Sequence, residues 1–565
     1  MSTLVLAALM MAGFIVAYHT YGRFLGSKIF RVAADNVCPS HALKDDIDFV
    51  PANKHILFGH HFTSIAGLGP IVGPAVAIIW GWVPAVLWIF FGSILIGAVH
   101  DFGALVVSLR YNGRSIGDIS ADIINHRVRT LFLLIIFFLL LIVIAVFALV
   151  IAILFKMYPQ AVIPVWIEVP IAVWLGYMVY TKQYNHVVMG IIAVALMYLF
   201  VIAGAYLPVD LKELGLSAKQ VLIVWMLILF GYSYIASTLP VQKLLQPRDY
   251  INSHQLYIAF GLLILGLLLA RPEIVAPAYD PGPADAPPLW PFLFVVIACG
   301  AISGFHSLVS SGTTAKQCDS EKDARFVSYG SMLMEGSLAT LVIAAVAGGI
   351  GLGLKTDTGE LLIGQAAFSH HYASWAAAQG LGAKIGAFVQ GSANMIAYCG
   401  IPKNITMTIM GVFIVSFAAT TLDTATRLQR YIIGELACAY NFPQLARRHP
   451  ATLIAVLTAF ILAFYNGSGE GAMILWPLFG TVNQLLGGIA LLVITVYLAR
   501  KSISPLYTLI PLIFMVVMTG WAMWINLTDF FHTNNWLLFI IGGIVFILEI
   551  WMIVEALLYM RHKTG

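Results

Sequence analysis

Two adjacent histidines followed by a cluster of helix-breaking residues are the most informative feature of this sequence. The helix breakers fall within one eight-residue stretch, 67–74, that follows His60 and His61, and they are Gly67, Gly69, Pro70, Gly73 and Pro74. Glycine costs about 1 kcal/mol and proline about 3 kcal/mol in a helix interior, so this segment predicts an unwound joint between two half-helices. Freed amides at such a joint can bind an anionic group, and freed carbonyls can bind a cation. Each histidine either carries a proton or bonds a carbonyl as a structural residue.

A second stretch, residues 302–314, is polar although the sequence around it is apolar. Three residues of the first stretch recur in it with the same spacing: Gly59, His61 and Gly67 correspond to Gly304, His306 and Gly312. We predict that the two stretches together form a solute site. Its candidate residues are Gly67, Gly69, Pro70, Gly73, Ser303, Gly304, His306, Ser307 and Ser310.

Two carboxylates in otherwise apolar segments are candidates for proton coupling, together with His60 and His61. Ionisable residues inside membrane segments are costly and are functional hypotheses by default. Glu335 lies well inside its segment, where a buried carboxylate is suited to carrying a proton. Asp101 lies close to a segment end, so it either serves coupling or pairs with Arg110 or Arg114.

The elements that position these residues are predicted to be membrane-spanning helices. Hydrophobic residues make up 60% of the chain and charged residues only 10%, against roughly a quarter charged in soluble domains. Residues 131–155 carry no charge and exceed the roughly 20 residues that cross a bilayer. The five cysteines show no metal-ligand or disulfide spacing. We therefore predict an all-α polytopic membrane protein without a metal.

Hydrophobic windows predict about 15 transmembrane helices. They cover residues 3–29, 55–80, 83–109, 130–155, 161–181, 186–207, 219–238, 250–270, 289–311, 326–353, 403–423, 450–466, 471–499, 504–526 and 534–560. Lysine and arginine concentrate in alternate loops, which places the N-terminus outside and the C-terminus inside by the positive-inside rule. Residues 1–30 are interpreted as a retained extra helix, because they lack the basic start and cleavage site of a signal peptide.

Residues 361–400 are predicted to form an outer-face lid or re-entrant segment. Their apolar part, Ile385 to Cys399, could be counted as a span. Counting it would reverse every later helix and place the basic residues between 427 and 448 outside. Irregular backbone at membrane depth is tolerated only against protein or a water-filled cavity.

The two unusual stretches are predicted to cross the membrane in opposite directions, because seven spans separate their starts. Paired discontinuous helices in inverted halves indicate a solute site near the middle of the membrane in secondary transporters.

The same stretches closely resemble the carbon starvation protein A family. The similarity runs through Leu57–Phe62, Ala66–Pro74, Gly97–Phe102, Gly113–Gly117, Ser303–His306, Gly312–Gln317 and Thr420–Arg427. The resemblance implies uptake of peptides or pyruvate across the bacterial inner membrane, coupled to protons. It also implies a LeuT-like inverted-repeat core over residues 50–500. The first half would span 55–207, inserted helices 219–270, the second half 289–499, and additional C-terminal helices 504–565.

In a LeuT-like core, the end of the helix predicted at 403–423 faces the first broken helix. Hydroxyls and freed carbonyls can bind sodium there, which makes Thr420, Thr421 and Asp423 candidate ion ligands. A salt bridge or a helix cap involving Asp423 and Arg427 is the alternative.

Other functions are less consistent with the sequence. A metal or haem enzyme would need a ligand motif such as HExxH or CxxCH, and the chain has none. A pump would need a Walker motif, and a channel would need rings of pore charges. We predict no enzymatic activity and no cofactor apart from a proton or sodium as coupling ion. The expected partners are a small solute and lipid, without nucleic acid. The solute and the oligomeric state remain open.

Overall fold

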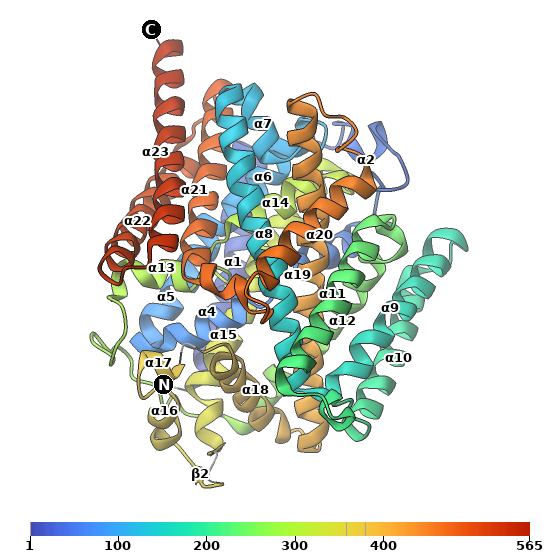
Figure 1. Cartoon of the computed structure of the whole chain (residues 1–565), viewed down its shortest axis with the longest axis vertical. Coiled ribbons are helices and arrows are strands. Elements are labelled where there is room, and N and C mark those ends of the chain that lie inside the picture. The colour runs from blue at the N-terminus through green and yellow to red at the C-terminus, as the bar shows by residue number, and fades with distance from the viewer. Residues whose placement is uncertain (1, 357–358, 379, 565) are drawn as a thin grey trace.

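The computed structural model describes residues 2–356, 359–378 and 380–564, and nearly all of them are helical (Figure 1). The first half contains α1 (Thr3–Ala17), α2 (Pro39–Ala42), α3 (Lys54–Ala66), α4 (Gly69–Ala77), α5 (Trp82–Gly92), α6 (Ala98–Arg110), α7 (Ile116–Ile123), α8 (His126–Met157), α9 (Val162–Gly176), α10 (His186–Tyr206), α11 (Ala218–Thr238) and α12 (Leu245–Ala270).

The second half contains α13 (Leu289–Val296), α14 (Gly304–Gly312), α15 (Gly330–Ala347), α16 (Gln365–His371), α17 (Trp375–Ala378), α18 (Leu381–Ala397), α19 (Lys403–Ala439), α20 (Arg448–Phe464), α21 (Trp476–Arg500), α22 (Leu506–His532) and α23 (Trp536–Thr564). A two-stranded antiparallel hairpin of β1 (Leu354–Lys355) and β2 (Leu361–Leu362) precedes α16.

The predicted class, a helical polytopic membrane protein with broken helices, is confirmed. Among the described residues, 12 helices are long and apolar enough to cross a membrane, and the bent pair α3–α4 makes 13. The count of about 15 was slightly high by this measure. Of the two remaining predicted segments, 289–311 is interrupted into α13 and α14, and 450–466 is the 17-residue α20.

The first predicted joint is a real break in the helix. Asn53 caps α3, since its Oδ1 accepts a hydrogen bond from the His55 amide at 2.9 Å. The helix ends at Gly67, whose φ of +45° is a conformation that side chains oppose. Gly69 and Pro70 then start α4, and the two helical pieces meet at an angle of 42°.

The second predicted joint is longer. Residues 297–303 connect α13 to α14 without helical structure, and Gly300 lies in this connection with φ of +89°. Both stretches that broke the sequence pattern are therefore discontinuous helices.

Two helices extend beyond their predicted bounds. α12 begins at Leu245 rather than near residue 250, and α19 continues to Ala439 rather than ending at Asp423. As a result, Arg248 and Arg427, which lie outside the predicted spans 250–270 and 403–423, are buried in the helical bundle. The hydropathy pattern predicted helices that were too short because a span is taken to end where charged residues begin. These two arginines can be buried because carboxylates from other parts of the chain neutralise them.

The segment 361–400 folds as short helices packed at one end of the bundle, and that this segment is an outer-face lid stays a prediction. The hydroxyl of Tyr372 donates to the Ala75 carbonyl at 2.6 Å, and the rings of Trp375 and Trp80 lie 5.2 Å apart. α18 packs so closely on α15 that a Cβ on Gly391 would lie 2.2 Å from the Ala345 carbonyl oxygen. α18 is not among the described helices that are long and apolar enough to cross a membrane.

Each end of the helical bundle has a contact between segments that are distant in the sequence. At one end, Thr3 Oγ1 donates to the Pro272 carbonyl at 2.7 Å. At the other end, Asn125 Nδ2 donates to Glu555 Oε2 at 2.9 Å. Figure 1 shows β2, α16 and α17 at the first of these ends and α2 and α7 at the second. The start of α1 and the C-terminal part of α23 therefore lie at opposite faces.

Candidate functional site

The two breaks pack against each other, and glycines allow the contact. A Cβ on Gly69 would lie 2.1 Å from Cys299 Cβ, and one on Gly73 would lie 2.6 Å from the Val296 carbonyl oxygen. Gly67 faces α19 instead, where an added Cβ would lie 2.5 Å from Thr421 Oγ1. The predicted solute residues Gly67, Gly69, Pro70 and Gly73 thus form the joint between the discontinuous helices and α19.

A buried cluster of ionisable groups lies beside these breaks. His306 on α14 is located between two carboxylates: its Nδ1 is 3.1 Å from Asp101 Oδ2 on α6, and its Nε2 is 3.5 Å from Glu335 Oε2 on α15. Asp101 Oδ1 is 2.7 Å from His100 Nδ1, and Glu335 Oε1 accepts a hydrogen bond from the Gly300 amide at 2.9 Å. All four side chains are fully buried. The cluster therefore links α6, α14, α15 and the second break through ionisable side chains.

The charge balance of this cluster favours a bound proton. Two carboxylates buried away from water are costly unless each has a positive or hydrogen-bonding partner. His306 is the imidazole shared by Asp101 and Glu335, and the 3.5 Å contact to Glu335 is longer than a good hydrogen bond. Small movements of α14 or α15 would change how well this pair holds a proton.

Asp101 does not form the predicted alternative contacts. Arg110 pairs with Glu321, and Arg114 pairs with Asp118 and Asp122, whereas Asp101 bonds only histidines in the described contacts. The alternative prediction for Asp101, an ion pair with Arg110 or Arg114, is therefore wrong. The sequence signal that located Glu335 and Asp101 was simply a carboxylate inside an apolar segment.

The same cluster includes the described residues that could hold a metal ion. Cys299, His306 and Glu335 each offer one ligand atom, and these atoms lie within 4.8 Å of one another. The spacing of the cysteines did not reveal this group, because its third member, Glu335, comes from a different helix. That the protein works without a metal stays a prediction.

His60 and His61 both contact the threonines that follow α14, and His60 also contacts a carboxylate. His60 Nδ1 lies 2.5 Å from Asp249 Oδ2 on α12, and its Nε2 lies 3.0 Å from Thr313 Oγ1. His61 Nδ1 lies 2.8 Å from Thr314 Oγ1, while its Nε2 is buried without a hydrogen-bond partner. Among the residues that the structure describes, neither histidine bonds a backbone carbonyl, and both connect α3 to the end of the second broken helix by side-chain contacts.

The serines and glycine at the start of α14 have mainly structural partners. Asn483 on α21 caps this helix, since its Oδ1 accepts from the Phe305 amide at 2.9 Å and its Nδ2 donates to Ser303 Oγ at 2.9 Å. Gly304 allows α21 to approach, because a Cβ there would lie 2.1 Å from the Asn483 carbonyl oxygen. The N-terminus of α14 is therefore already occupied by a protein side chain.

Two other predicted hydroxyls of α14 differ in their environment. Ser307 Oγ donates to the Gly304 carbonyl of its own helix at 2.7 Å. Ser310 Oγ is buried and has no hydrogen-bond partner. Buried polar atoms are almost always paired in native proteins, so Ser310 remains available to a ligand or to water.

The candidate ion ligands lie where the first break meets α19. Thr420 Oγ1 donates to the Thr63 carbonyl at 3.2 Å, and Thr421 Oγ1 donates to the Phe417 carbonyl at 3.1 Å. Asp423 Oδ2 pairs with Arg248 at 2.5 Å and accepts from the Tyr232 hydroxyl at 2.9 Å. Asp423 thus forms a salt bridge, but with Arg248 rather than with Arg427.

A second buried charge network extends from this salt bridge and was missed in the sequence. Arg248 Nε lies 3.4 Å from Glu168 Oε1 on α9, and Glu168 Oε2 accepts from Ser416 Oγ at 3.0 Å. Asp249, the neighbour of Arg248, pairs with His60. Glu168 could have been found as a lone carboxylate in an apolar segment, whereas Arg248 was hidden by the late predicted start of α12.

Comparison with known proteins identifies what this chain resembles. The model of the carbon starvation protein CstA family matches residues 2–522. The chain is 33% identical over 555 residues to the "peptide transporter CstA" of Campylobacter jejuni, covering 90% of this chain and 78% of that protein. It is 30% identical over 588 residues to the "pyruvate/proton symporter BtsT" of Escherichia coli, covering 92% of this chain and 81% of that protein.

Solved structures that resemble the chain include two transporters. A manganese transporter of Eremococcus coleocola has a TM-score of 0.45 and 12% identity, covering 92% of this chain and 99% of that one. Mhp1, a nucleobase-cation-symport-1 family transporter, has a TM-score of 0.38 and 12% identity, covering 93% of this chain and 96% of that one.

Proposed function

Because the chain belongs to the carbon starvation protein CstA family, we propose that it imports a small carboxylate-bearing solute across the bacterial inner membrane by proton-coupled secondary transport. The single observation that carries the coupling is His306, buried between Asp101 and Glu335 beside the two helix breaks. The proton cluster and the solute site share the two helix breaks. A change in the breaks when one of them is filled can therefore alter the release of the other.

The helix breaks supply the solute site in this proposal. Leu68 and Gly69 lie at the start of α4, where backbone amides point out of the helix and favour an anionic group. Ser310 Oγ, one turn after His306 on α14, is a buried hydroxyl without a partner. A carboxylate is the group that peptides and pyruvate share, and the names of two relatives refer to these two solutes.

Coupling follows from the electrostatics of the buried cluster. With a proton bound, the carboxylates and His306 approach neutrality, and α14 and α15 can pack closely in low-dielectric surroundings. Loss of the proton leaves uncompensated negative charge, which is stabilised only if water enters. Alternating access then exposes the cluster to one side at a time, and a proton gradient drives the solute inward.

In this proposal, the proton-releasing side faces the cytoplasm. The face with Asn125 and Glu555 carries most of the basic loops and is assigned inside, and the face with Thr3 and the 361–400 lid is assigned outside. The start of α1 then lies outside and the C-terminal part of α23 inside.

The proposal is tested by uptake into proteoliposomes with an imposed pH gradient. Radiolabelled pyruvate, a dipeptide and a tripeptide are supplied in parallel, with and without a protonophore. We expect accumulation of at least one of these solutes that requires the gradient. The matched variants are Glu335→Gln and Glu549→Gln, since Glu549 is a buried carboxylate on α23, outside the cluster.

Glu335→Gln should abolish gradient-driven uptake while solute exchange across the membrane without a gradient continues. Glu549→Gln should retain driven uptake. Wild-type protein that equilibrates these solutes but never accumulates them would contradict secondary active transport. Normal accumulation by Glu335→Gln would remove Glu335 from the coupling role.

A further inference from the structure

A loop at the inner face is fastened to three helical segments. We call residues 43–53 the inner strap, which leads directly into α3. The amides of Val50 and Ala52 donate to the carbonyls of Lys316 and Gln317, at 3.2 and 3.0 Å, just after the second broken helix. On its other side, the Ile47 carbonyl accepts from the Val241 amide at 2.9 Å, between α11 and α12.

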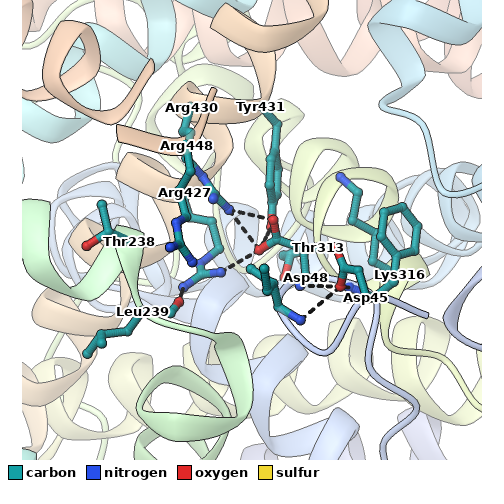
Figure 2. Close-up of polar contacts among 12 residues, drawn as sticks. Asp45, Asp48, Thr238, Leu239, Thr313, Lys316, Arg427, Arg430, Tyr431 and Arg448 are labelled. Atoms are coloured by element: carbon teal, nitrogen blue, oxygen red, sulfur yellow. Dashed lines mark hydrogen bonds and ion pairs between the residues drawn. The ribbon is translucent and has the colours of Figure 1, made fainter. Parts of the chain in front are cut away.

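The strongest attachment of the inner strap is a single carboxylate. Asp48 Oδ1 lies 2.6 Å from Arg427 Nη1, 2.7 Å from Arg430 Nη2 and 2.8 Å from the Tyr431 hydroxyl. Asp48 Oδ2 lies 2.9 Å from the same Arg430 nitrogen. Figure 2 shows the Asp48 carboxylate between the two guanidinium groups and the tyrosine hydroxyl. All three partners belong to α19, so one side chain of the strap joins it to this helix.

The α19 side of this contact is rigidly built. Arg427 also donates to the Leu239 carbonyl at 2.5 Å and to the Ala236 carbonyl at 3.0 Å, at the end of α11. The Lys316 ammonium lies 3.6 Å from the centre of the Tyr431 ring (residues labelled in Figure 2). Burial favours the neutral form of Asp48, but Arg427, Arg430 and Lys316 outweigh it and hold the pKa of that carboxyl well below its usual range. Asp48 is therefore ionised at physiological pH.

The position of this contact in the chain links it to the helix breaks. Asp48 lies five residues before Asn53, the cap of α3, and α3 ends at the Gly67 break. α19 carries Arg427 and, less than two turns before it, Thr421, which packs against Gly67. Asp48 thus ties the inner end of the first broken helix to the same helix that packs against its break.

Water has access to the contact without dismantling the bundle. A cavity of about 650 Å³ is lined by Asp48, Lys316, Arg430 and Tyr431, among others. The Asp48 side chain is 15% exposed, whereas Arg427 is 1% exposed. Charged groups that separate next to a hydrated cavity are resolvated, so separation is far less costly than in a dry interior.

We propose that Asp48 is the positioning residue that latches the inner end of α3 to α19 while the inner side is closed, and that its release from Arg427, Arg430 and Tyr431 opens the solute path to the cytoplasm. This inference rests on the proposed alternating-access transport. The latch acts through α3 and touches neither the solute nor the proton cluster.

The protein contains its own reporters for this movement. Cys318 is fully buried, and its backbone pairs with Ala52 of the inner strap. Cys438 is exposed at the end of α19. A membrane-impermeant maleimide added to inside-out vesicles should label Cys438 rapidly and Cys318 slowly, and site-resolved mass spectrometry distinguishes the two.

The test compares Asp48→Asn with Asp46→Asn. Asp46 is in the same strap, its side chain is 69% exposed, and its one ion pair among the described residues is with Lys44, so it is a matched control. Asp48→Asn should raise the labelling rate of Cys318 by about tenfold and leave Cys438 unchanged, because the open state gains population when its competing contacts are lost. It should also lower gradient-driven uptake more than solute exchange. Asp46→Asn should match wild type in all measurements.

Unchanged Cys318 labelling in Asp48→Asn would overturn the latch even if transport falls. If Asp48→Asn is not recovered as a folded protein, Tyr431→Phe decides: it removes one hydrogen bond, keeps the ring under Lys316, and should raise Cys318 labelling to a smaller extent. An unchanged rate in Tyr431→Phe would then overturn the proposal. Failure of the proposed transport is recognised separately, as absence of gradient-driven uptake by the wild type.

Discussion

The Nε2 atom of His306 lies 3.5 Å from Oε2 of Glu335, at full burial and next to the break between α13 and α14. The two residues come from helices that are separate in the sequence, and the Gly300 amide of the break itself donates to the other Glu335 oxygen. Protonation of this pair is therefore mechanically connected to the irregular backbone that we assign to solute binding.

His306→Gln should uncouple transport from the proton gradient. Glutamine can still hydrogen-bond Asp101 and Glu335, but it cannot carry a proton, so gradient-driven uptake should fall by about 100-fold while exchange persists. Uptake and counterflow in the same proteoliposomes measure the two processes. His254→Gln is the control, because His254 bonds the Tyr250 carbonyl outside the cluster. Equal losses in both variants would contradict a special role for His306.

Gly67→Ala should destabilise the protein and impair transport. The backbone at Gly67 has φ of +45°, and an added Cβ would lie 2.5 Å from Thr421 Oγ1, so strain and overlap together should cost about 1–3 kcal/mol or more. Thermal unfolding in detergent measures the loss. Gly231→Ala on α11, which has nothing within 4 Å of an added Cβ, should be neutral or slightly stabilising. A Gly67→Ala protein as stable as wild type would show that the break can relax without cost.

Sodium should not be required for uptake. The Asp423 carboxylate, the one negatively charged group among the three candidate ligands, is already paired with the Arg248 guanidinium, so it does not offer an uncompensated charge to a cation. Replacing sodium by choline on both sides of the vesicle membrane, at constant pH gradient, should leave the uptake rate unchanged. A strong dependence on sodium would instead favour a sodium-coupled carrier and an ion site at Thr420 and Thr421.

Gly391→Ala should loosen the outer segment from the bundle. α18 approaches α15 so closely that the new Cβ would lie 2.2 Å from the Ala345 carbonyl oxygen, and overpacking of this kind costs about 1–3 kcal/mol. Gly386→Ala in the same helix has nothing within 4 Å of its Cβ and should be tolerated. The thermal unfolding temperatures of the two variants check the difference. Similar values would mean that α18 is not held by this contact.

Local features of the sequence determined most of the fold. The spans could be located because crossing a bilayer requires a continuous apolar stretch, and the break at Gly67 could be located because glycine and proline act on their own backbone. Glu335 and Asp101 could be selected because a carboxylate in an apolar segment is unusual by itself. Each of these properties belongs to a single stretch of chain.

The tertiary structure decided the partners. Nothing in the sequence pairs Arg248 with Asp423 and Glu168, or Asp48 with Arg427 and Arg430, because the energy of a buried ion pair depends on which helices approach each other. The start of α12 and the end of α19 were predicted wrongly for the same reason. Hydropathy is calculated from one segment alone, so it does not include the opposite charge on another helix that makes burial of an arginine possible. His60 and His306 were identified as candidates by their positions in the sequence, but only the packing showed that His60 belongs to Asp249 and that His306 lies between Asp101 and Glu335.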